Sequence, residues 1–204
     1  MCKSKLRDFY RKRIQNDLND YNILWGEDAP EKNNVRYSIF EKINLIADDT
    51  VIDMGSGYAD LYKYLNEKFL IDKYIGVEVV KEFAEVSKTR YPELCICEDS
   101  IFEIDVSEYD ADYVCWFGSL NKWWSIGSDL KKNDKIHDYL VSLYGVVNKG
   151  IIFNGFSPFA DYQKNENIYV DPAMLISKCS SFGISDVLIQ FDKPKYEMTI
   201  GIFK

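Results

Sequence analysis

The sequence predicts an α/β protein: a three-layer sandwich with a mostly parallel seven-stranded sheet, helices on both faces and a C-terminal antiparallel β-hairpin. Two observations lead to this fold class. From residue 50 onward, strand-like apolar runs alternate with helical patterns about every 20 to 25 residues, as in parallel sheets. The last two apolar runs have only a short turn between them, so we expect them to pair as an antiparallel hairpin.

The helices at the N-terminus come before this alternation. Apolar residues at helical spacing from Leu6 to Leu18 predict an amphipathic helix, and a second helical pattern runs from Val35 to Ile46. The stretch between them is polar and irregular, and Pro30 is expected to act there as a breaker.

Strands and helices then follow in turn. The expected strands are residues 50–54, 74–79, 94–97, 111–117, 150–154, 185–191 and 196–203. The expected helices are residues 59–69, 81–90, 136–147 and 171–182. Asp171 fits the N-cap of the last helix and Pro172 its first position.

Length and composition favour one globular domain. The chain has 204 residues, of which 47% are hydrophobic and 28% charged, and this balance excludes a largely disordered chain. No repeat, low-complexity segment or Pro/Gly/Ser-rich linker divides it. We therefore expect a single domain over residues 1–204, with a helical cap at 1–47 and a ligand-binding core at 48–204.

Charge and hydropathy restrict the partners. Lys and Arg number 25 and Asp and Glu 33, so the formal net charge is −8, which disfavours nucleic acid and anionic membranes. No apolar run approaches the ~18 residues of a membrane span, and the charged N-terminus lacks a signal core. We expect a cytoplasmic protein, a monomer or a homodimer.

The cysteines form no metal-binding pattern. Their number is odd, their spacing is scattered, and His137 is the only histidine, so we expect no metal site. Two of them are two residues apart and would share one face of a strand. Reduced, mostly buried thiols are expected for Cys2, Cys95, Cys97, Cys115 and Cys179.

A glycine loop joins the first strand of the core to its helix. Gly55, Ser56 and Gly57 allow a tight turn and a close approach of the backbone to a ligand, although tight turns also use glycine for structural reasons alone. Asp53 and Asp60 flank this loop and would repel a pyrophosphate. Asp60 also replaces the third glycine of GxGxxG, so NAD is disfavoured and a ligand with a cationic amino-acid end is favoured.

Acidic residues also follow the next two strands. Glu78 ends the second strand, where a carboxylate can accept hydrogen bonds from ribose hydroxyls or simply be a solvated charge. The turn at residues 98–101 offers a carboxylate to an exocyclic amine such as that of adenine, although acidic turns are common.

These segments resemble the class I S-adenosylmethionine-dependent methyltransferases. Residues 51–57, Val-Ile-Asp-Met-Gly-Ser-Gly, resemble motif I, and residues 74–78 resemble the strand that ends in the ribose-binding acid. Residues 98–101 resemble the adenine-contacting turn, and residues 110–115 the fourth strand. The resemblance covers residues 48–154, and the predicted hairpin agrees with the family's antiparallel seventh strand. It implies a Rossmann-like fold, S-adenosyl-L-methionine (SAM) as cofactor and S-adenosyl-L-homocysteine (SAH) as product.

The resemblance also implies roles for matched residues. The two loop glycines would pass under the methionine part, Asp53 would hold its amino group and Glu78 the ribose. Asp99 would hold the adenine amine, Ile101 would pack on the ring, and Tyr58 or Tyr10 could close over the cofactor. Ala59 stands where the family often has glycine. The cofactor-binding residues expected are Arg36, Asp53, Gly55, Ser56, Gly57, Tyr58, Glu78, Val79, Asp99, Ser100, Ile101 and Phe117.

A narrower likeness links the chain to small stand-alone members of that family. Trp25-Gly26 and Arg36-Tyr37 match two of their features, and residues 117–121 match a Ser-Gly-x-x-Asn loop except that Phe117 replaces the serine. Arg36 either pairs with the cofactor carboxylate or lies on the surface of its helix.

Aromatic residues gather after the fourth and fifth strands, where an acceptor would bind. Such rings can hold a flat or apolar molecule or stabilise a sulfonium, or they can be core. The span 155–170 is either a lid or a surface loop. His137 is a candidate general base, with a surface position on its helix as the alternative. The expected substrate-binding residues are Trp25, Asn121, Trp123, Trp124, Phe156 and Phe159.

The predicted function is in-line methyl transfer to a small molecule, promoted mainly by proximity and desolvation. An oxygen acceptor is favoured because no Asn/Asp-Pro-Pro-Tyr/Phe motif follows the fourth strand. A protein or RNA methyltransferase and a non-catalytic SAM-binding subunit are the alternatives.

Overall fold

The structure is a computed structural model that describes residues 3–14, 29–118, 120, 133–165, 167–193 and 196–204. Seven strands follow the order β3-β2-β1-β4-β5-β7-β6 in one sheet, which confirms the predicted fold class. The chain has two compact units, residues 2–105 and 106–204, and the single-domain organisation stays a prediction. Within the described residues, no helix is long and apolar enough to cross a membrane.

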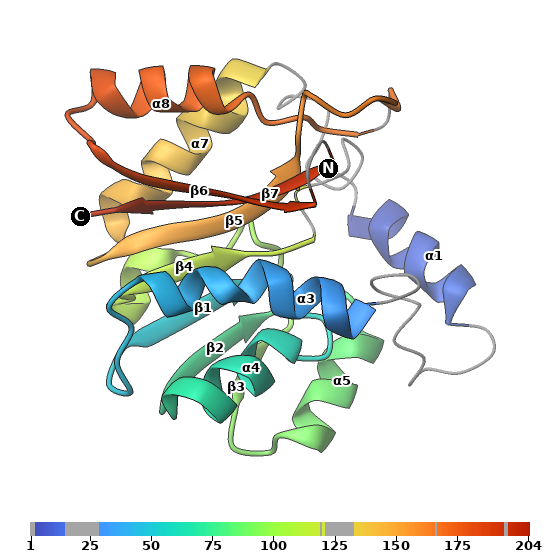
Figure 1. The fold of residues 1–204 in the computed structure, drawn as a ribbon. Coiled ribbons are helices and arrows are strands. Elements are labelled where there is room, and N and C mark those ends of the chain that lie inside the picture. The colour runs from blue at the N-terminus through green and yellow to red at the C-terminus, as the bar shows by residue number, and fades with distance from the viewer. Residues whose placement is uncertain (1–2, 15–28, 119, 121–132, 166, 194–195) are drawn as a thin grey trace. The chain divides into compact units, whose positions relative to one another are not determined.

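The first unit contains three parallel strands and their helices (Figure 1). Strand β2 pairs on one side with β1, with Ile52 opposite Ile75, and on the other with β3, with Val77 opposite Cys97. Its elements are α1 (Lys3–Arg13), α3 (Ala29–Tyr37), the 3-10 helix η1 (Ser38–Lys42), β1 (Thr50–Met54), α4 (Asp60–Phe69), β2 (Lys73–Val77), α5 (Lys81–Arg90) and β3 (Cys95–Cys97).

Strand β1 is the most deeply buried strand of this unit. Val51, Ile52 and Met54 are 0% exposed, as expected for a continuous apolar run covered on both faces. Asp53 is the one charged residue in the strand, and it is buried as well. The strand therefore carries a carboxylate into the interior next to the glycine loop.

The second unit contains the C-terminal antiparallel pair (Figure 1). Strand β5 runs parallel to β4 and antiparallel to β7, and β6 and β7 form the predicted hairpin. Asp171 caps α8 as predicted, because its Oδ1 accepts the N–H groups of Ala173 and Met174 at 2.8 and 3.3 Å. The elements are the 3-10 helix η2 (Val106–Tyr109), β4 (Tyr113–Trp116), α7 (Asn133–Val146), β5 (Gly150–Phe156), α8 (Pro172–Ser181), β6 (Asp186–Lys193) and β7 (Glu197–Phe203).

Three local predictions differ from the structure. Pro30 does not break the chain but stands in the first turn of α3, where its missing N–H costs no intrahelical hydrogen bond. The helix expected up to Ile46 changes to 3-10 geometry at Ser38 and ends at Lys42. Ala59 lies just outside α4 because it adopts a left-handed conformation with φ of 59°.

Candidate functional site

The candidate site begins with the glycine loop at the carboxyl end of β1. Gly55 and Gly57 have φ angles of 83° and 55°, which favour glycine at both positions. The N–H groups of Gly55 and Ser56 both donate to the carbonyl of Val77, at 2.8 and 3.1 Å. The loop is therefore fixed against the end of the neighbouring strand β2.

Glu78 follows β2 directly and joins three parts of the site. Its Oε2 accepts the N–H of Gly57 at 2.9 Å, and its Oε1 accepts the N–H of Val80 at 2.7 Å. Its own N–H donates to the carbonyl of Cys97 at 2.9 Å, at the end of β3. The side chain is buried, so the alternative of a solvated strand-end charge is wrong.

A second buried carboxylate, Asp53, lies before the loop. The Tyr74 hydroxyl on β2 donates to its Oδ2 at 2.5 Å, and both residues are buried. Tyr74 is a site residue that the sequence analysis missed, because a tyrosine in a buried strand looks like an ordinary core residue. The contact fixes the orientation of the Asp53 carboxylate.

Both carboxylates are in surroundings that disfavour their ionised forms. Burial raises the pKa of Asp53 from 3.8 to about 7, with Glu78 and Asp60 adding to the rise and the Tyr74 hydrogen bond opposing it. Burial likewise raises the pKa of Glu78 from 4.5 to about 7, against backbone N–H donors. None of these groups is cationic, so a positively charged ligand would favour ionisation of both acids.

Ser56 has a buried hydroxyl with an unused hydrogen-bonding capacity. Within the described part of the chain, its Oγ has no hydrogen-bond partner. The hydroxyl lies beside Gly76 of β2, where a Cβ would come within 2.8 Å of it. A buried hydroxyl without a hydrogen-bond partner costs free energy, and a ligand of the loop that pairs with Ser56 would remove this cost.

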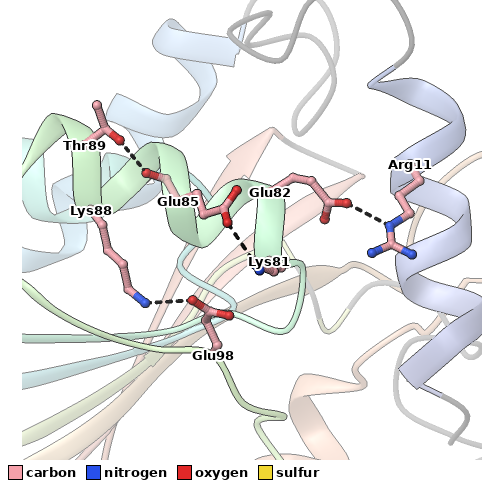
Figure 2. A network of polar contacts seen from close by, with 7 residues as sticks. All are labelled: Arg11, Lys81, Glu82, Glu85, Lys88, Thr89 and Glu98. Carbon is pink, nitrogen blue, oxygen red and sulfur yellow. Dashed lines mark hydrogen bonds and ion pairs between the residues drawn. The ribbon is translucent and has the colours of Figure 1, made fainter.

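Helix α1 packs beside the turn that follows Glu78. The ring of Tyr10 lies 5.2 Å from that of Phe83 on α5, and Arg7 Nε donates to the carbonyl of Val79 at 2.9 Å. Figure 2 shows Arg11 of α1 reaching Glu82 of α5, with 2.8 Å between Nε and Oε1. Burial and, after it, the charge of Glu78 raise the pKa of Tyr10 to about 12, and the charge of Arg13 opposes the rise.

Tyr58, which the sequence analysis names as a residue that could close over the cofactor, is buried. Its ring is 1% exposed and packs edge-on against Phe83 at 5.1 Å, in a cluster with Val80. Tyr58 thus supports the turn from the inside.

The turn after β3 holds its own shape. Asp99 Oδ1 accepts the N–H of Ser100 at 2.7 Å, and Ser100 Oγ accepts the N–H of Phe102 at 3.3 Å. Asp99, Ser100 and Ile101 are all half-buried, so their side chains remain partly accessible. The adjacent Glu98 pairs with Lys88 of α5 at 2.8 Å, as Figure 2 shows.

Arg36 is buried, so the alternative of a surface arginine is wrong. Its Nη1 donates to Asn33 Oδ1 at 2.7 Å, one turn earlier in α3.

In the second unit, two of the predicted aromatic residues are core. Trp116 and Phe117 are 1% and 3% exposed, and Trp116 packs edge-on against Tyr139 of α7. Phe156 is half-buried beside Tyr169, and Phe159 is 62% exposed. Trp25, Asn121, Trp123 and Trp124 lie outside the described residues.

His137 and Asn154 are the buried polar residues of note in this unit. His137 is 2% exposed, so the surface position offered as its alternative is wrong. Asn154 of β5, which the sequence analysis missed, accepts the N–H of Gly118 through Oδ1 at 2.7 Å. Its Nδ2 is buried without a partner in the described part of the chain, so it can donate to a bound group.

The cysteines only partly follow the prediction. Cys115 and Cys179 are buried, but Cys95 is exposed and Cys97 half-buried, so the expectation of mostly buried thiols was wrong for the β3 pair. Among the residues that the structure describes, no group of three or more His, Cys, Asp or Glu is placed to hold a metal ion. Cys2 lies outside them.

Comparison with solved structures identifies the fold. The sequence matches no family model and no curated protein. The magnesium protoporphyrin IX methyltransferase ChlM of Synechocystis PCC 6803 with bound SAH is 12% identical, with a TM-score of 0.63 over 99% of both chains. DhpI, in a complex with SAM and HEP, is 12% identical, with a TM-score of 0.65 over 98% of this chain and 96% of that one. The fold is that of the class I SAM-dependent methyltransferases.

A third structure supports this assignment. A SAM-dependent methyltransferase of Leishmania major is 12% identical, with a TM-score of 0.65 over 99% of this chain and 82% of that one. At such identities the likeness to class I methyltransferases concerns the fold. The chemistry of this chain has to be argued from its own residues.

Proposed function

We propose that this protein is an enzyme that transfers a methyl group from SAM to a small-molecule acceptor. The class I methyltransferase fold supports the proposal, and the observation that carries it is the buried Glu78 carboxylate. That carboxylate links the glycine loop, through Gly57, to the turn at Val80. Ligands of open α/β sheets bind at this end of the strands.

The residues present fit the charge of SAM. Its amino-acid end carries an ammonium and its sulfur is a sulfonium, so the molecule brings positive charge to Asp53 and Glu78. Those acids are buried, and burial disfavours their ionised forms until a cation is near. A pyrophosphate would meet the same acids with repulsion, which argues against a dinucleotide.

The hydrogen-bonding groups fit as well. Both oxygens of Glu78 accept backbone N–H groups, and a carboxylate has about four lone-pair sites, so it can still accept from ribose hydroxyls. The Ser56 hydroxyl, which has no hydrogen-bond partner among the described residues, is available for the amino-acid part. Asp99 and Ile101 are half-buried in the turn after β3, as an adenine contact requires.

Each group then has a task before and during transfer. SAM supplies a methyl group activated by its positively charged sulfur. Gly55 and Gly57 let the backbone pass close to SAM. Asp53 and Glu78 orient the bound SAM. Tyr10 and Tyr58 support or cover the turn that follows Glu78. In-line transfer depends mainly on alignment and the exclusion of water, so no base has to be assigned, and His137 stays a candidate only.

We favour an oxygen acceptor on a small molecule. The segment after β4, residues 118–122, lacks the Asn/Asp-Pro-Pro-Tyr/Phe sequence, and the net charge of −8 disfavours nucleic acid. Phe156 and Phe159 supply partly exposed apolar surface. ChlM, a magnesium protoporphyrin IX methyltransferase, supports a flat acceptor for a protein of this fold. We also propose that the protein is cytoplasmic and acts as a monomer or a homodimer.

Titration calorimetry tests the cofactor site directly. Wild-type protein is titrated with SAM, SAH and, as control, NADH, and the same is done with Glu78→Gln. We expect micromolar binding of SAM and SAH and none of NADH. Loss of charge-assisted hydrogen bonds at about 1.5 to 3 kcal/mol should weaken SAM binding by roughly 10- to 100-fold in Glu78→Gln.

A matched control makes the same chemical change elsewhere. Glu85→Gln alters an exposed glutamate of α5 that pairs with Lys81 at 3.5 Å (Figure 2), and should bind SAM as the wild type does. If neither SAM nor SAH binds the wild type, the proposal fails. SAM binding with no SAH formed from a panel of hydroxylated and aromatic acceptors would instead indicate a SAM-binding subunit.

A further inference from the structure

We propose that Cys95 and Cys97 form a two-thiolate site for one soft metal ion of the Zn²⁺ type, at the solvent-exposed edge strand β3. The site uses none of the side chains assigned to the cofactor. The proposal therefore stands or falls independently of the methyltransferase function.

The separation of the two sulfur atoms fits one shared ion. The residues are two apart on β3, so their side chains lie on the same face of the strand. Their Sγ atoms are 4.0 Å apart. Two thiolates bound to one tetrahedral zinc at about 2.3 Å each lie about 3.8 Å from each other. Metal binding thus needs almost no movement of either side chain.

The backbone holds this arrangement in place. Cys95 and Cys97 lie opposite Ile75 and Val77 in the parallel pairing with β2. The carbonyl of Cys97 also accepts the N–H of Glu78 at 2.9 Å. Because the strand is already ordered, binding would not have to order it, which favours affinity.

A disulfide fits this pair less well than an ion does. Residues two apart on a strand have Cα atoms about 6.6 Å apart. This is near the upper limit of roughly 6.8 Å for disulfides, and the sulfur atoms would have to approach to about 2.05 Å. Two free thiols therefore fit the geometry of the strand better than a disulfide does.

The remaining coordination positions would be open. Cys95 is exposed and Cys97 half-buried, and β3 lies at an edge of the sheet. In the described residues no third Cys, His, Asp or Glu completes a cluster, so water or an external ligand would fill the other positions. Both thiols lose a proton and two metal–sulfur bonds form, with no change of oxidation state. Thiolates select soft ions over Mg²⁺ or Ca²⁺.

Zinc titration of thiol variants tests the proposal. Reduced protein is prepared in a Cys2→Ser background, since Cys2 lies outside the described residues, and Zn²⁺ is titrated in competition with a chromophoric chelator. We expect one Zn²⁺ per chain. Cys95→Ser and Cys97→Ser should each bind Zn²⁺ at least about tenfold more weakly. Mutation of residues that only hydrogen-bond to the ligands of a zinc site already causes a loss of about this size.

Two controls separate this site from other thiols. Cys179→Ser removes a buried thiol of α8 and should leave zinc binding unchanged. Phenylarsine oxide, which joins two thiols to one arsenic and releases water, should block two thiols in the reference protein and none in Cys95→Ser. Zinc affinity unchanged in both β3 variants, or no zinc bound by the reference protein, would overturn the proposal, whatever the outcome with SAM.

Discussion

Replacement of Glu78 by glutamine is expected to stabilise the ligand-free protein at neutral pH, although glutamine can accept only one of the two backbone N–H groups that the carboxylate accepts. Glu78 is buried, and its pKa is raised from 4.5 to about 7. The folded protein therefore binds this proton more tightly than the unfolded chain does. The resulting stability is fully present below pH 4.5 and is lost as the pH rises through about 7.

The pKa change sets the magnitude. A rise from 4.5 to about 7, at about 1.36 kcal/mol per pH unit, corresponds to roughly 3 kcal/mol of stability lost on ionisation. Glutamine cannot ionise, so the variant keeps that stability. Protonated glutamate and glutamine have similar shapes, and each keeps one carbonyl oxygen that can accept a backbone N–H group of Gly57 or Val80. The two proteins should therefore differ little at low pH.

Urea unfolding at several pH values measures the difference. We expect Glu78→Gln and the wild type to agree within about 1 kcal/mol near pH 5, and the variant to be more stable by roughly 3 kcal/mol at about pH 8. Glu85→Gln, which changes an exposed ion pair, should stay within about 1 kcal/mol of the wild type throughout. A difference between Glu78→Gln and wild type that does not grow with pH would refute the reasoning.

Two further predictions concern the support of the site. Gly76→Ala should cost about 1 to 3 kcal/mol and weaken SAM binding, because its Cβ would meet side-chain atoms of β3 and of the glycine loop at 2.7 and 2.8 Å. In Gly145→Ala of α7, the added Cβ would meet no neighbouring atom of the described residues within 4 Å, so this variant should be more stable by up to about 1 kcal/mol. Thermal unfolding in which the two variants lose stability alike would contradict this prediction. Tyr10→Ala should release α1 to limited proteolysis, since it removes the packing on α5. The control Arg11→Ala breaks an exposed ion pair worth under about 1 kcal/mol, so this variant should be cleaved at the wild-type rate. Equal cleavage of the two variants would show that Tyr10 does not hold α1 on α5.

The sequence by itself determined those features that depend on neighbouring residues. The predicted strand 50–54 and helix 81–90 coincide with β1 and α5, because a short apolar run and a helical repeat are local patterns. The Asp171 cap of α8 was predictable for the same reason. The glycine loop and Glu78 could be recognised because their spacing along the chain reflects one strand–loop–helix unit.

Contacts between distant segments could not be predicted in this way. Tyr74 donates to Asp53 across 21 positions, and the sequence does not show that these two side chains meet. The burial of Arg36 and His137 also depends on elements that pack over them, so a helical repeat alone left their exposure open.

For the cysteine pair on β3, the sequence decided one property and the tertiary structure another. Spacing placed Cys95 and Cys97 on one face of a strand, but only the sheet order put that strand at an edge and left Cys95 exposed. The raised pKa values of Asp53 and Glu78 likewise come from burial by the whole unit. Local patterns decide which elements form, whereas solvent exposure, and with it charge state and reactivity, is decided by tertiary packing.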